Sequence, residues 1–507
     1  MKKLLILSLF ILAVPAWATH TCSTCYVDYM GGSDANSGAS TVLAWQHLPG
    51  MTGATGNAAS QVPVAGDRYI LKGGVTWPAT AFPMTWTWSG STGNLIYIGV
   101  DATYYTGGSW ARPIFNAGGG STDWHNSYFA YFSGANYWQL DNIEWTGLFW
   151  SAAPSYGKAN YIVAQSPTNF ILSNNYAHGM THSGCSGASC NNWDGTPNGF
   201  FVGSTSGGNT GASAYGNVID NADGSADCCI AFFGGPPVQY QNVIAHLTNG
   251  SVVNLATSFH DNLIGPLNLS YDALVHQNCF EDNFDQGILV YNNVCKQIYN
   301  GLVMNISPQQ TYTAYVFNNL LVNSPTTQLN MAVTQAPSTG TCCGTVNFYN
   351  NIVQAPASVA CFNIEAATNS ANLINNHCMT SGALYVPENG SSHPPIANTT
   401  NLLQTVAAAN SAGYTLANLF QPIASNSPTV GAATNETSAC GTASDLCLTT
   451  TQGVVYNTGN HTVSYPAMRT IARPASGTWD IGAYQYQSGI TSSYSGAITM
   501  SGGVTIH

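Results

Sequence analysis

The stretch Asn350-Asn351-Ile352-Val353 is one of five close copies of a phrase that joins asparagine to a short apolar run. The other four are Asn278-Cys279-Phe280, Asn292-Asn293-Val294-Cys295, Asn318-Asn319-Leu320-Leu321 and Asn375-Asn376-His377-Cys378. Looser copies occur earlier, at Asn142-Ile143, Asn174-Asn175-Tyr176, Asn217-Val218-Ile219, Asn242-Val243-Ile244 and Asn262-Leu263-Ile264. The clearest consecutive copies lie about 25 to 32 residues apart, and a recurrence in this range is typical of solenoids and propellers.

The phrase suits the corner of a repeating coil. Asparagine tolerates the left-handed backbone conformation of a tight corner, and its amide can bond to the amides stacked above and below it. Strands that are each too short to bury a face alone can then stack into one continuous core. An asparagine-rich antiparallel sandwich is the alternative, but its strands would recur about every 8 to 12 residues. The longer recurrence favours an all-β fold, a parallel β-helix with a cap at each end.

The charge content excludes one large class of partners. Only 6% of the residues are charged, the formal net charge is -12, and Lys and Arg together number nine. Two of these, Lys2 and Lys3, lie at the very start of the chain. The remainder are too few to form the clustered basic surface of a nucleic-acid-binding protein, so we expect no nucleic-acid partner.

The first 18 residues have the pattern of a secretory signal peptide. Lys2 and Lys3 precede an apolar run from Leu4 to about Val14, and Ala16-Trp17-Ala18 supplies the small residues of a cleavage site. This run is too short to span a bilayer, and no later segment approaches 18 consecutive apolar residues. We therefore expect cleavage near Ala18 and a secreted or cell-surface protein without a transmembrane segment.

A solenoid grows in one dimension, so one long domain is the economical interpretation of 507 residues. Long Gly/Ser/Asn-rich stretches interrupt the repeat, and such insertions emerge as loops on one face of a solenoid. The expected divisions are a signal peptide at 1–18, an N-terminal cap at 19–65, rungs at 66–400 with loop insertions near 150–235, irregular last rungs and a C-terminal cap at 401–486, and a flexible tail at 487–507.

Fourteen cysteines, an even number, fit an oxidising compartment and several disulfides. Pairs that lie close enough in sequence to bond locally are Cys22 with Cys25, Cys185 with Cys190, and Cys440 with Cys447. The vicinal pairs Cys228-Cys229 and Cys342-Cys343 are expected to bond to other partners. Sequence leaves the remaining connectivity open.

Both ends of the chain resemble a known group of proteins. The start contains Tyr26-Val27-Asp28, Gly32-Ser33-Asp34-Ala35-Asn36-Ser37-Gly38 and Gly66-Asp67-Arg68-Tyr69-Ile70-Leu71-Lys72-Gly73-Gly74. These segments resemble the opening of secreted right-handed parallel β-helix proteins of the pectin-lyase-like superfamily. The resemblance implies a right-handed coil but leaves the activity open, because that superfamily includes lyases, hydrolases, epimerases, tailspikes and adhesins.

The far end contains Ser427-Pro428-Thr429-Val430-Gly431-Ala432 and Trp479-Asp480-Ile481-Gly482-Ala483-Tyr484. These segments are similar to the closing part of bacterial β-helix proteins described as carrying a "choice-of-anchor" region. Two departures stand out: the first segment lacks the acidic residue usual before its glycine, and Gln485 stands where Glu is common.

The densest group of ionisable side chains lies between residues 260 and 285. It consists of His260, Asp261, Asp272, His276, Glu281, Asp282 and Asp285. Residues one rung apart stack on the same face of a β-helix, so some of these side chains could converge. Paired carboxylates are what glycoside hydrolysis requires, and Asp261, Asp282 and Asp285 could also bind Ca²⁺ through oxygen ligands. The alternative is that these residues cap turns and face solvent.

A second candidate group is Asn221-Ala222-Asp223-Gly224 followed by Asp227. Asp223 and Asp227 faintly resemble the acid and base carboxylates of polygalacturonase-type hydrolases. The chain departs from that pattern, because Cys228 replaces the second Asp of the family's Asp-Asp-Cys motif and the family's Gly-His-Gly and Arg-x-Lys elements do not follow. The alternative is a loop held down by a disulfide.

A zinc site is a third possibility. His178, His182, Cys185 and Cys190 have spacings that could bind zinc. In an exported chain, however, the two cysteines are expected to form a disulfide instead.

Together these features predict a secreted protein that acts on or binds an extracellular polysaccharide or cell-surface glycan, as a glycoside hydrolase-like or lyase-like enzyme. A lyase needs a basic residue to remove a proton, and Lys158 and Lys296 each stand alone in mid-chain, which favours the hydrolase. A row of exposed tryptophans would stack on sugar rings, whereas buried tryptophans would belong to the core. The alternative function, favoured by the low charge, is a non-catalytic adhesin or structural solenoid.

Overall fold

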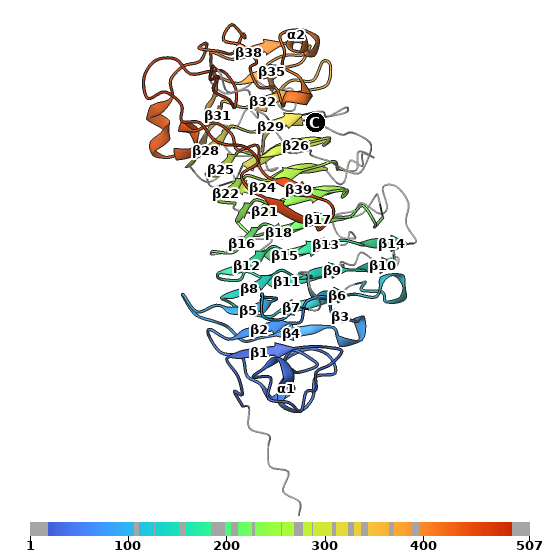
Figure 1. The fold of residues 1–507 in the computed structure, drawn as a ribbon. Coiled ribbons are helices and arrows are strands. Elements are labelled where there is room, and N and C mark those ends of the chain that lie inside the picture. Colours follow the sequence, from blue (N-terminus) through green and yellow to red (C-terminus); the bar gives the residue numbers. More distant parts are fainter. Residues whose placement is uncertain are drawn as a thin grey trace, which may run out of the picture.

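The structure is a computed structural model of the chain (Figure 1). It describes residues 19–105, 111–125, 127–151, 159–183, 198–203, 211–225, 229–254, 256–267, 277–285, 287–306, 311–322, 329–335, 343–364, 370–387 and 396–488. The expected signal peptide and nearly all of the expected tail lie outside these residues.

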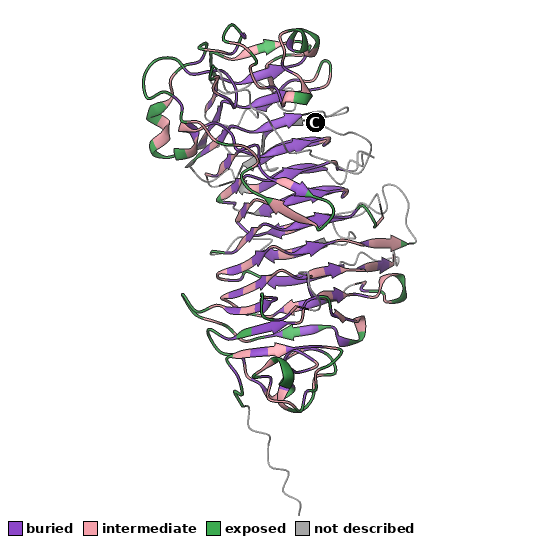
Figure 2. Cartoon of the chain, viewed as in Figure 1, coloured by how far each residue is buried: buried purple, intermediate pink, exposed green. Residues whose placement is uncertain are grey.

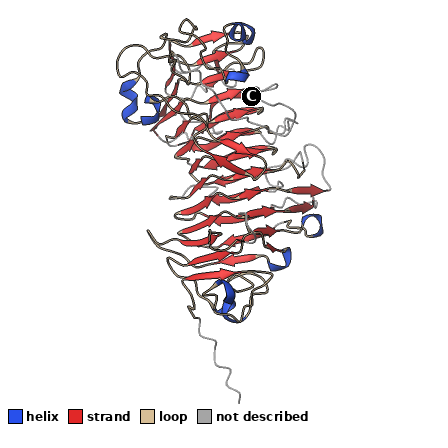
Figure 3. Cartoon of the chain, in the orientation of Figure 1, coloured by secondary structure: helices blue, strands red, loops and turns tan. Residues whose placement is uncertain are grey.

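The chain is a right-handed parallel β-helix, as predicted, built from three long sheets (Figures 1 and 3). The 13-stranded sheet contains β1 Thr24–Val27, β2 Arg68–Leu71, β5 Ile96–Gly99, β8 Trp138–Asp141, β12 Phe170–Ser173, β16 Ser213–Tyr215, β19 Val238–Tyr240, β22 Ser258–His260, β25 Leu289–Tyr291, β28 Thr311–Phe317, β31 Cys343–Tyr349, β34 Ser370–Ile374 and β37 Ile396–Thr399. The 12-stranded sheet contains β3 Thr76–Trp77, β6 Ile114–Asn116, β9 Glu144–Thr146, β13 Tyr176–Ala177, β17 Val218–Asp220, β20 Val243–Ala245, β23 Leu263–Ile264, β26 Val294–Lys296, β29 Leu320–Val322, β32 Ile352–Gln354, β35 His377–Met379 and β38 Leu402–Gln404.

The 11-stranded sheet closes each rung on the third side. It contains β4 Met84–Trp86, β7 Ser127–Phe132, β11 Ala159–Gln165, β15 Asn198–Gly203, β18 Ile230–Gly235, β21 Asn249–Asn254, β24 Asn278–Asp285, β27 Asn300–Ile306, β30 Leu329–Gln335, β33 Phe362–Ile364 and β36 Tyr385–Pro387. Two smaller sheets are the parallel pair β10 Phe149–Ser151 and β14 Thr181–Ser183, and the antiparallel pair β39 Val455–Asn457 and β40 Thr462–Ser464. Helices are short: α1 Gly56–Ser60, α2 Val406–Ser411, and the 3-10 turns Thr41–Leu43, Ala79–Ala81, Gly119–Ser121, Leu416–Asn418, Thr437–Gly441 and Ser444–Cys447.

The repeated asparagines form the corner between the 13- and 12-stranded sheets. In each double copy the first asparagine takes the left-handed conformation, with φ of 55° at Asn350 for example. The second points inward and bonds to its neighbours one rung away, which confirms the predicted amide stacking. The ladder consists of Asn175, Asn217, Asn242, Asn262, Asn293, Asn319, Asn351, Asn376 and Asn401, with Nδ2 to Oδ1 distances of 2.9 to 3.1 Å.

The interior of the coil is a continuous apolar core, and most strands of the coil are drawn as buried in Figure 2. Tryptophans belong to it: Trp77, Trp86, Trp124, Trp138, Trp145 and Trp150 are all buried. The described part of the chain therefore favours core packing over an exposed sugar-stacking row for these six residues.

Disulfides fall into two kinds. The predicted pairs Cys22–Cys25 and Cys440–Cys447 are present, whereas Cys185 and Cys190 lie outside the described residues. Cys279–Cys295 and Cys361–Cys378 cross the interior of a rung to the 12-stranded sheet, and neither pair was predicted from the sequence. No helix in the described ranges is long and apolar enough to cross a membrane.

After β38 the chain turns back and packs on the outer face of the 12-stranded sheet. The pair β39 and β40, residues 455–464, is named here the C-terminal hairpin. It lies over the middle of the solenoid in Figure 1, where Tyr456 bonds to Asp220 of β17. The segment thus covers a lateral face as well as adjoining the last rungs.

Candidate functional site

The outer face of the 12-stranded sheet carries polar side chains at regular positions. Trp145, Ala177 and Ile219 point into the core, so their neighbours on each side point outward. The ladder position of a rung is the place that the inward-pointing asparagine takes, such as Asn175 or Asn217. The outward positions are the first and third residues after it. They place Glu144 on β9, His178 just after β13 and Asp220 at the end of β17.

Two carboxylates, those of Glu144 and of Asp223 in the turn after β17, converge on the imidazole of His178. His178 Nδ1 lies 2.7 Å from Asp223 Oδ2, and His178 Nε2 lies 3.2 Å from Glu144 Oε1. The backbone N–H of Gly179 donates to the other Asp223 oxygen at 2.9 Å. Side-chain exposure is 54% for Asp223, 26% for Glu144 and 14% for His178, so the carboxylates reach solvent. Glu144, His178 and Asp223 are called here the carboxylate–imidazole cluster.

The carboxylates control the charge of the imidazole. Burial alone would lower the pKa of His178, but the hydrogen bonds and negative charges of Asp223 and Glu144 outweigh it and raise that pKa from 6.5 to about 9. Burial works against ionisation of Asp223 too, yet the bond to His178 lowers its pKa overall. At neutral pH the cluster therefore holds a proton on His178, next to an ionised Asp223.

A second polar group lies beside the cluster. Asp220 is buried; its Oδ1 accepts from His246 Nδ1 at 2.6 Å and its Oδ2 accepts from the Tyr456 hydroxyl at 2.8 Å. Burial raises the pKa of Asp220, but these two bonds outweigh it and lower the pKa overall. This group links the cluster's rungs to the C-terminal hairpin.

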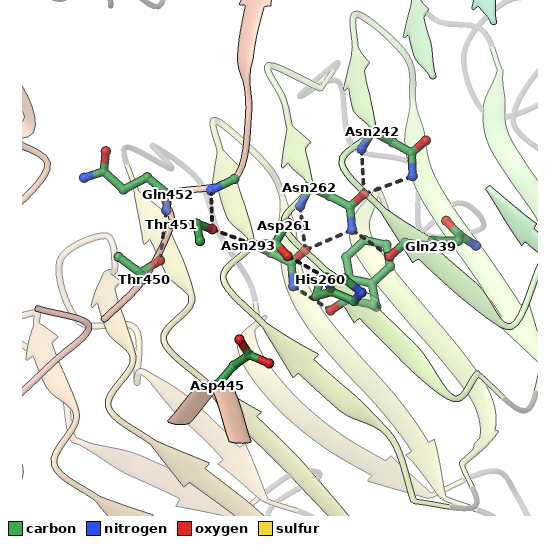
Figure 4. Close-up of polar contacts among 12 residues, drawn as sticks. Gln239, Asn242, His260, Asp261, Asn262, Asn293, Asp445, Thr450, Thr451 and Gln452 are labelled. Carbon is green, nitrogen blue, oxygen red and sulfur yellow. Dashed lines mark hydrogen bonds and ion pairs between the residues drawn. The ribbon is translucent and has the colours of Figure 1, made fainter. Parts of the chain in front are cut away.

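The first predicted group, residues 260–285, is spread around the coil. His260 bonds to Asp261 at the asparagine corner, and Thr451 of the C-terminal segment donates to Asp261 (Figure 4). Asp282 is fully buried on the 11-stranded sheet, in register with the core residues Val253 and Met304, so it points into the interior. Its Oδ1 accepts from the backbone N–H of Ala256 at 2.9 Å.

Other predicted positions are less fully described. Asp285 ends β24, while Asp227, Asp272 and His276 lie outside the described residues. Of the predicted carboxylates, the structure brings Asp223 together with a histidine and a second carboxylate, and brings Asp261 together with His260.

Metal sites remain predictions. Asp261 and Asp282, two of the three candidate calcium ligands, lie on different sides of the coil and already bond to other groups. Over the described ranges no three His, Cys, Asp or Glu side chains gather to hold a metal ion. Both nitrogens of His178, a candidate zinc ligand, face carboxylates instead.

Glu144 was not among the sequence candidates, and His178 was considered only for zinc. The sequence does contain a pattern that identifies both residues. Ile143 takes the ladder position in the rung before Asn175, and Glu144 is the next residue. His178 is three residues after Asn175. Charged residues at these two offsets from the repeated asparagine face outward, and a rung-by-rung alignment of the sequence would have selected them.

Comparison with known proteins gives distant structural likeness only. No protein-family model and no curated protein matches the chain. Among solved structures, a GH136 lacto-N-biosidase from Eubacterium ramulus has a TM-score of 0.44 and 12% identity, covering 76% of this chain and 68% of its own. Pectate lyase Pel9A has a TM-score of 0.42 and 13% identity, covering 92% and 96%. A rhamnogalacturonan lyase has a TM-score of 0.32 and 14% identity, covering 75% and 87%.

Proposed function

We propose that this protein is a secreted enzyme that hydrolyses glycosidic bonds at the carboxylate–imidazole cluster. The supporting observation is that Glu144 and Asp223 bond to opposite nitrogens of one imidazole on the outer face of the coil. Those two bonds and the width of the ring keep the bonded carboxylate oxygens no more than about 8 Å apart, and inverting glycoside hydrolases separate their carboxyl groups by roughly 6.5–9.5 Å.

The protonated His178 and the ionised Asp223 together suit hydrolysis. Asp223, the more exposed carboxylate, takes a proton from the attacking water. The proton stored on His178 passes through Glu144 to the leaving sugar oxygen as the glycosidic C–O bond breaks. Transfer of the proton from Asp223 back to His178 then restores the starting state, so one water is consumed and no other reactant is needed.

Export is part of the proposal. The first 18 residues have the signal-peptide pattern, and disulfides such as Cys279–Cys295 fit an oxidising compartment. A polysaccharide outside the cell is the substrate class that suits both an exported chain and a site on an exposed lateral face.

The test is an activity screen of the secreted protein against neutral and uronate-containing polysaccharides, with and without Ca²⁺. Reducing ends and the absorbance of unsaturated products are read in parallel. We expect reducing ends without new absorbance, reduced at least 100-fold by Asp223→Asn and by Glu144→Gln. Asp101→Asn is the matched control, because Asp101 is a carboxylate paired with Arg68 away from the cluster.

Three other results would contradict the proposal. Unsaturated products would identify a lyase. Activity that is lost in Asp285→Asn but retained in Asp223→Asn would move the site to the group at residues 260–285. Glycan binding without either product would favour the adhesin or structural solenoid.

A further inference from the structure

The C-terminal hairpin meets the carboxylate–imidazole cluster although the two are far apart in sequence. Tyr456 and Asp220, which bond directly, are 236 residues apart. In Figure 1 the hairpin lies over the strands of the middle rungs, next to β17. Three separate interactions hold it there: a stack of rings, a chain of hydrogen bonds and a buried guanidinium.

The ring stack leads directly to the cluster. The His178 ring lies 4.2 Å from the Tyr176 ring at an interplanar angle of 9°, and the His461 ring lies 4.0 Å from the other face of Tyr176 at 6°. Tyr176 is thus held between two imidazoles. An imidazolium over the face of a phenol is attracted by the ring's negative π face. The stack therefore fixes the plane of His178, which decides whether both its nitrogens can face carboxylates.

The hydrogen-bond chain fixes the orientation of His461. Its Nδ1 lies 2.8 Å from the Tyr456 hydroxyl, which itself lies 2.8 Å from Asp220 Oδ2. A phenol has one proton, and the ionised Asp220 can only accept it, so His461 Nδ1 must carry the proton donated to the phenol oxygen. The ring of His461 is consequently held in one tautomer and one plane.

The guanidinium of Arg112 ties down the tip of the hairpin. Arg112 is buried, and its Nη1 and Nη2 donate to the carbonyl oxygens of Asn460 and His461 at 3.3 and 3.1 Å. Its Nε and Nη2 donate to the carbonyl oxygen of Asn174, at the corner that precedes Tyr176. One side chain therefore joins the hairpin backbone to the rung that carries Tyr176 and His178.

Burial favours the neutral form of His461. The titratable groups that face it are the phenols of Tyr176 and Tyr456 and the charged groups Asp220, Glu144, His178 and Arg112. Burial is the main cause that lowers the pKa of His461, and the positive charges of His178 and Arg112 add to it, against the opposing effect of the two carboxylates. Tyr176 therefore has the neutral ring of His461 on one face and the charged ring of His178 on the other.

We propose that the C-terminal hairpin completes the candidate site, with His461 as a positioning residue that holds Tyr176 and, through it, the His178 imidazole between Asp223 and Glu144. The effect of this positioning on turnover rests on the proposed function. The positioning itself can be measured on the resting protein, without substrate.

The test is an NMR titration of the His178 imidazole in the full-length protein and in three variants. In the wild type we expect a pKa near 9. His461→Phe keeps a ring on Tyr176, so the pKa of His178 should stay well above 6.5. His461→Ala removes the ring, and we expect the pKa to fall by at least about one unit, with about a tenfold loss of turnover. Thr462→Ala is the control, because Thr462 bonds within the hairpin to Asn460 and does not touch the stack.

The outcomes separate this inference from the proposed function. An unchanged His178 pKa in His461→Ala, together with a lower melting temperature, would overturn it and leave the hairpin a purely structural element. A lowered pKa in a protein that cleaves no glycan would support the positioning and contradict the proposed function. If His461→Ala does not fold, His461→Gln repeats the test, since it keeps a donor for Tyr456 and removes the ring.

Discussion

His178 and Asp223 are bonded at 2.7 Å across neighbouring rungs, and this bond is shorter than the 3.2 Å contact between His178 and Glu144. Asp223 also accepts from the backbone N–H of Gly179, so its carboxylate is held from two directions. The bond joins a side chain from the end of β13 to one from the turn after β17. Rung stacking therefore creates the pair, and the hydrogen bond between the two residues reverses the effect that burial has on each pKa.

The first prediction concerns the charge of His178. Among the interactions that raise its pKa, the hydrogen bond to Asp223 is the largest and that to Glu144 follows. Asp223→Asn should therefore lower the pKa of His178 more than Glu144→Gln does, with both values moving from about 9 toward 6.5. Imidazole NMR titration measures both variants. Equal pKa values in wild type and Asp223→Asn would show that the pair is absent in solution.

The second prediction is a loss of stability at alkaline pH. The pKa of His178 is about 9 in the folded protein and 6.5 in the unfolded chain, so the folded state binds this proton more tightly. The stabilisation is fully present below pH 6.5 and is lost as the pH rises to 9. The melting temperature should fall over this range, and the fall should be smaller in His178→Gln. An identical slope in that variant would place the titrating group elsewhere.

The third prediction is a loss of stability at acidic pH, caused by a different histidine. His377 is buried, and burial lowers its pKa to about 4 despite the contact of its Nε2 with Gln404 Oε1 at 3.0 Å. Its neutral form is favoured in the folded state, so stability is full above pH 6.5 and decreases as the pH falls to 4. Replacing His377 by Gln should flatten this acidic decline. The alkaline decline should persist in the same variant, which makes it the internal control.

The part of the fold visible in the sequence is the part that repeats. Asn351 and Asn376 make the same kind of hydrogen bond in successive rungs, so asparagine recurs at this position and the ladder can be predicted. The corner conformation follows as well, because asparagine adopts positive φ at low cost. The inward orientation of Asp282 could not be predicted, since residues 278–283 alternate so that each face of β24 has both polar and apolar side chains.

The candidate site was only partly visible for a related reason. Asp223 was selected because Asn221-Ala222-Asp223 faintly resembles a motif of polygalacturonase-type hydrolases, but Glu144 and His178 become its neighbours only when rungs are aligned. The contribution of His461 carries no sequence signal at all. Its contact with Tyr176 depends on a segment that returns over the outer face, and such packing has no repeat by which to recognise it.

The fourth prediction concerns the asparagine ladder. Asn262 is fully buried; its Oδ1 accepts from the backbone N–H and Nδ2 of Asn242, and its Nδ2 donates to Asn293 Oδ1 and to the carbonyl oxygen of Gln239 (Figure 4). Asn262→Ala leaves these groups buried without partners, and each such group costs about 1–3 kcal/mol. We expect the free energy of unfolding to fall by at least about 3 kcal/mol, measured by denaturant titration.

Asn401→Ala is the matched control, because Asn401 ends the ladder and is only half buried. Water can replace its amide at the last rung, so we expect a loss of about 1 kcal/mol. Equal losses in the two variants would mean that burial of the stacked amide adds nothing to its contribution to stability. A larger loss at Asn262 would establish that the stacked amides stabilise the coil because each satisfies the buried polar groups of the next.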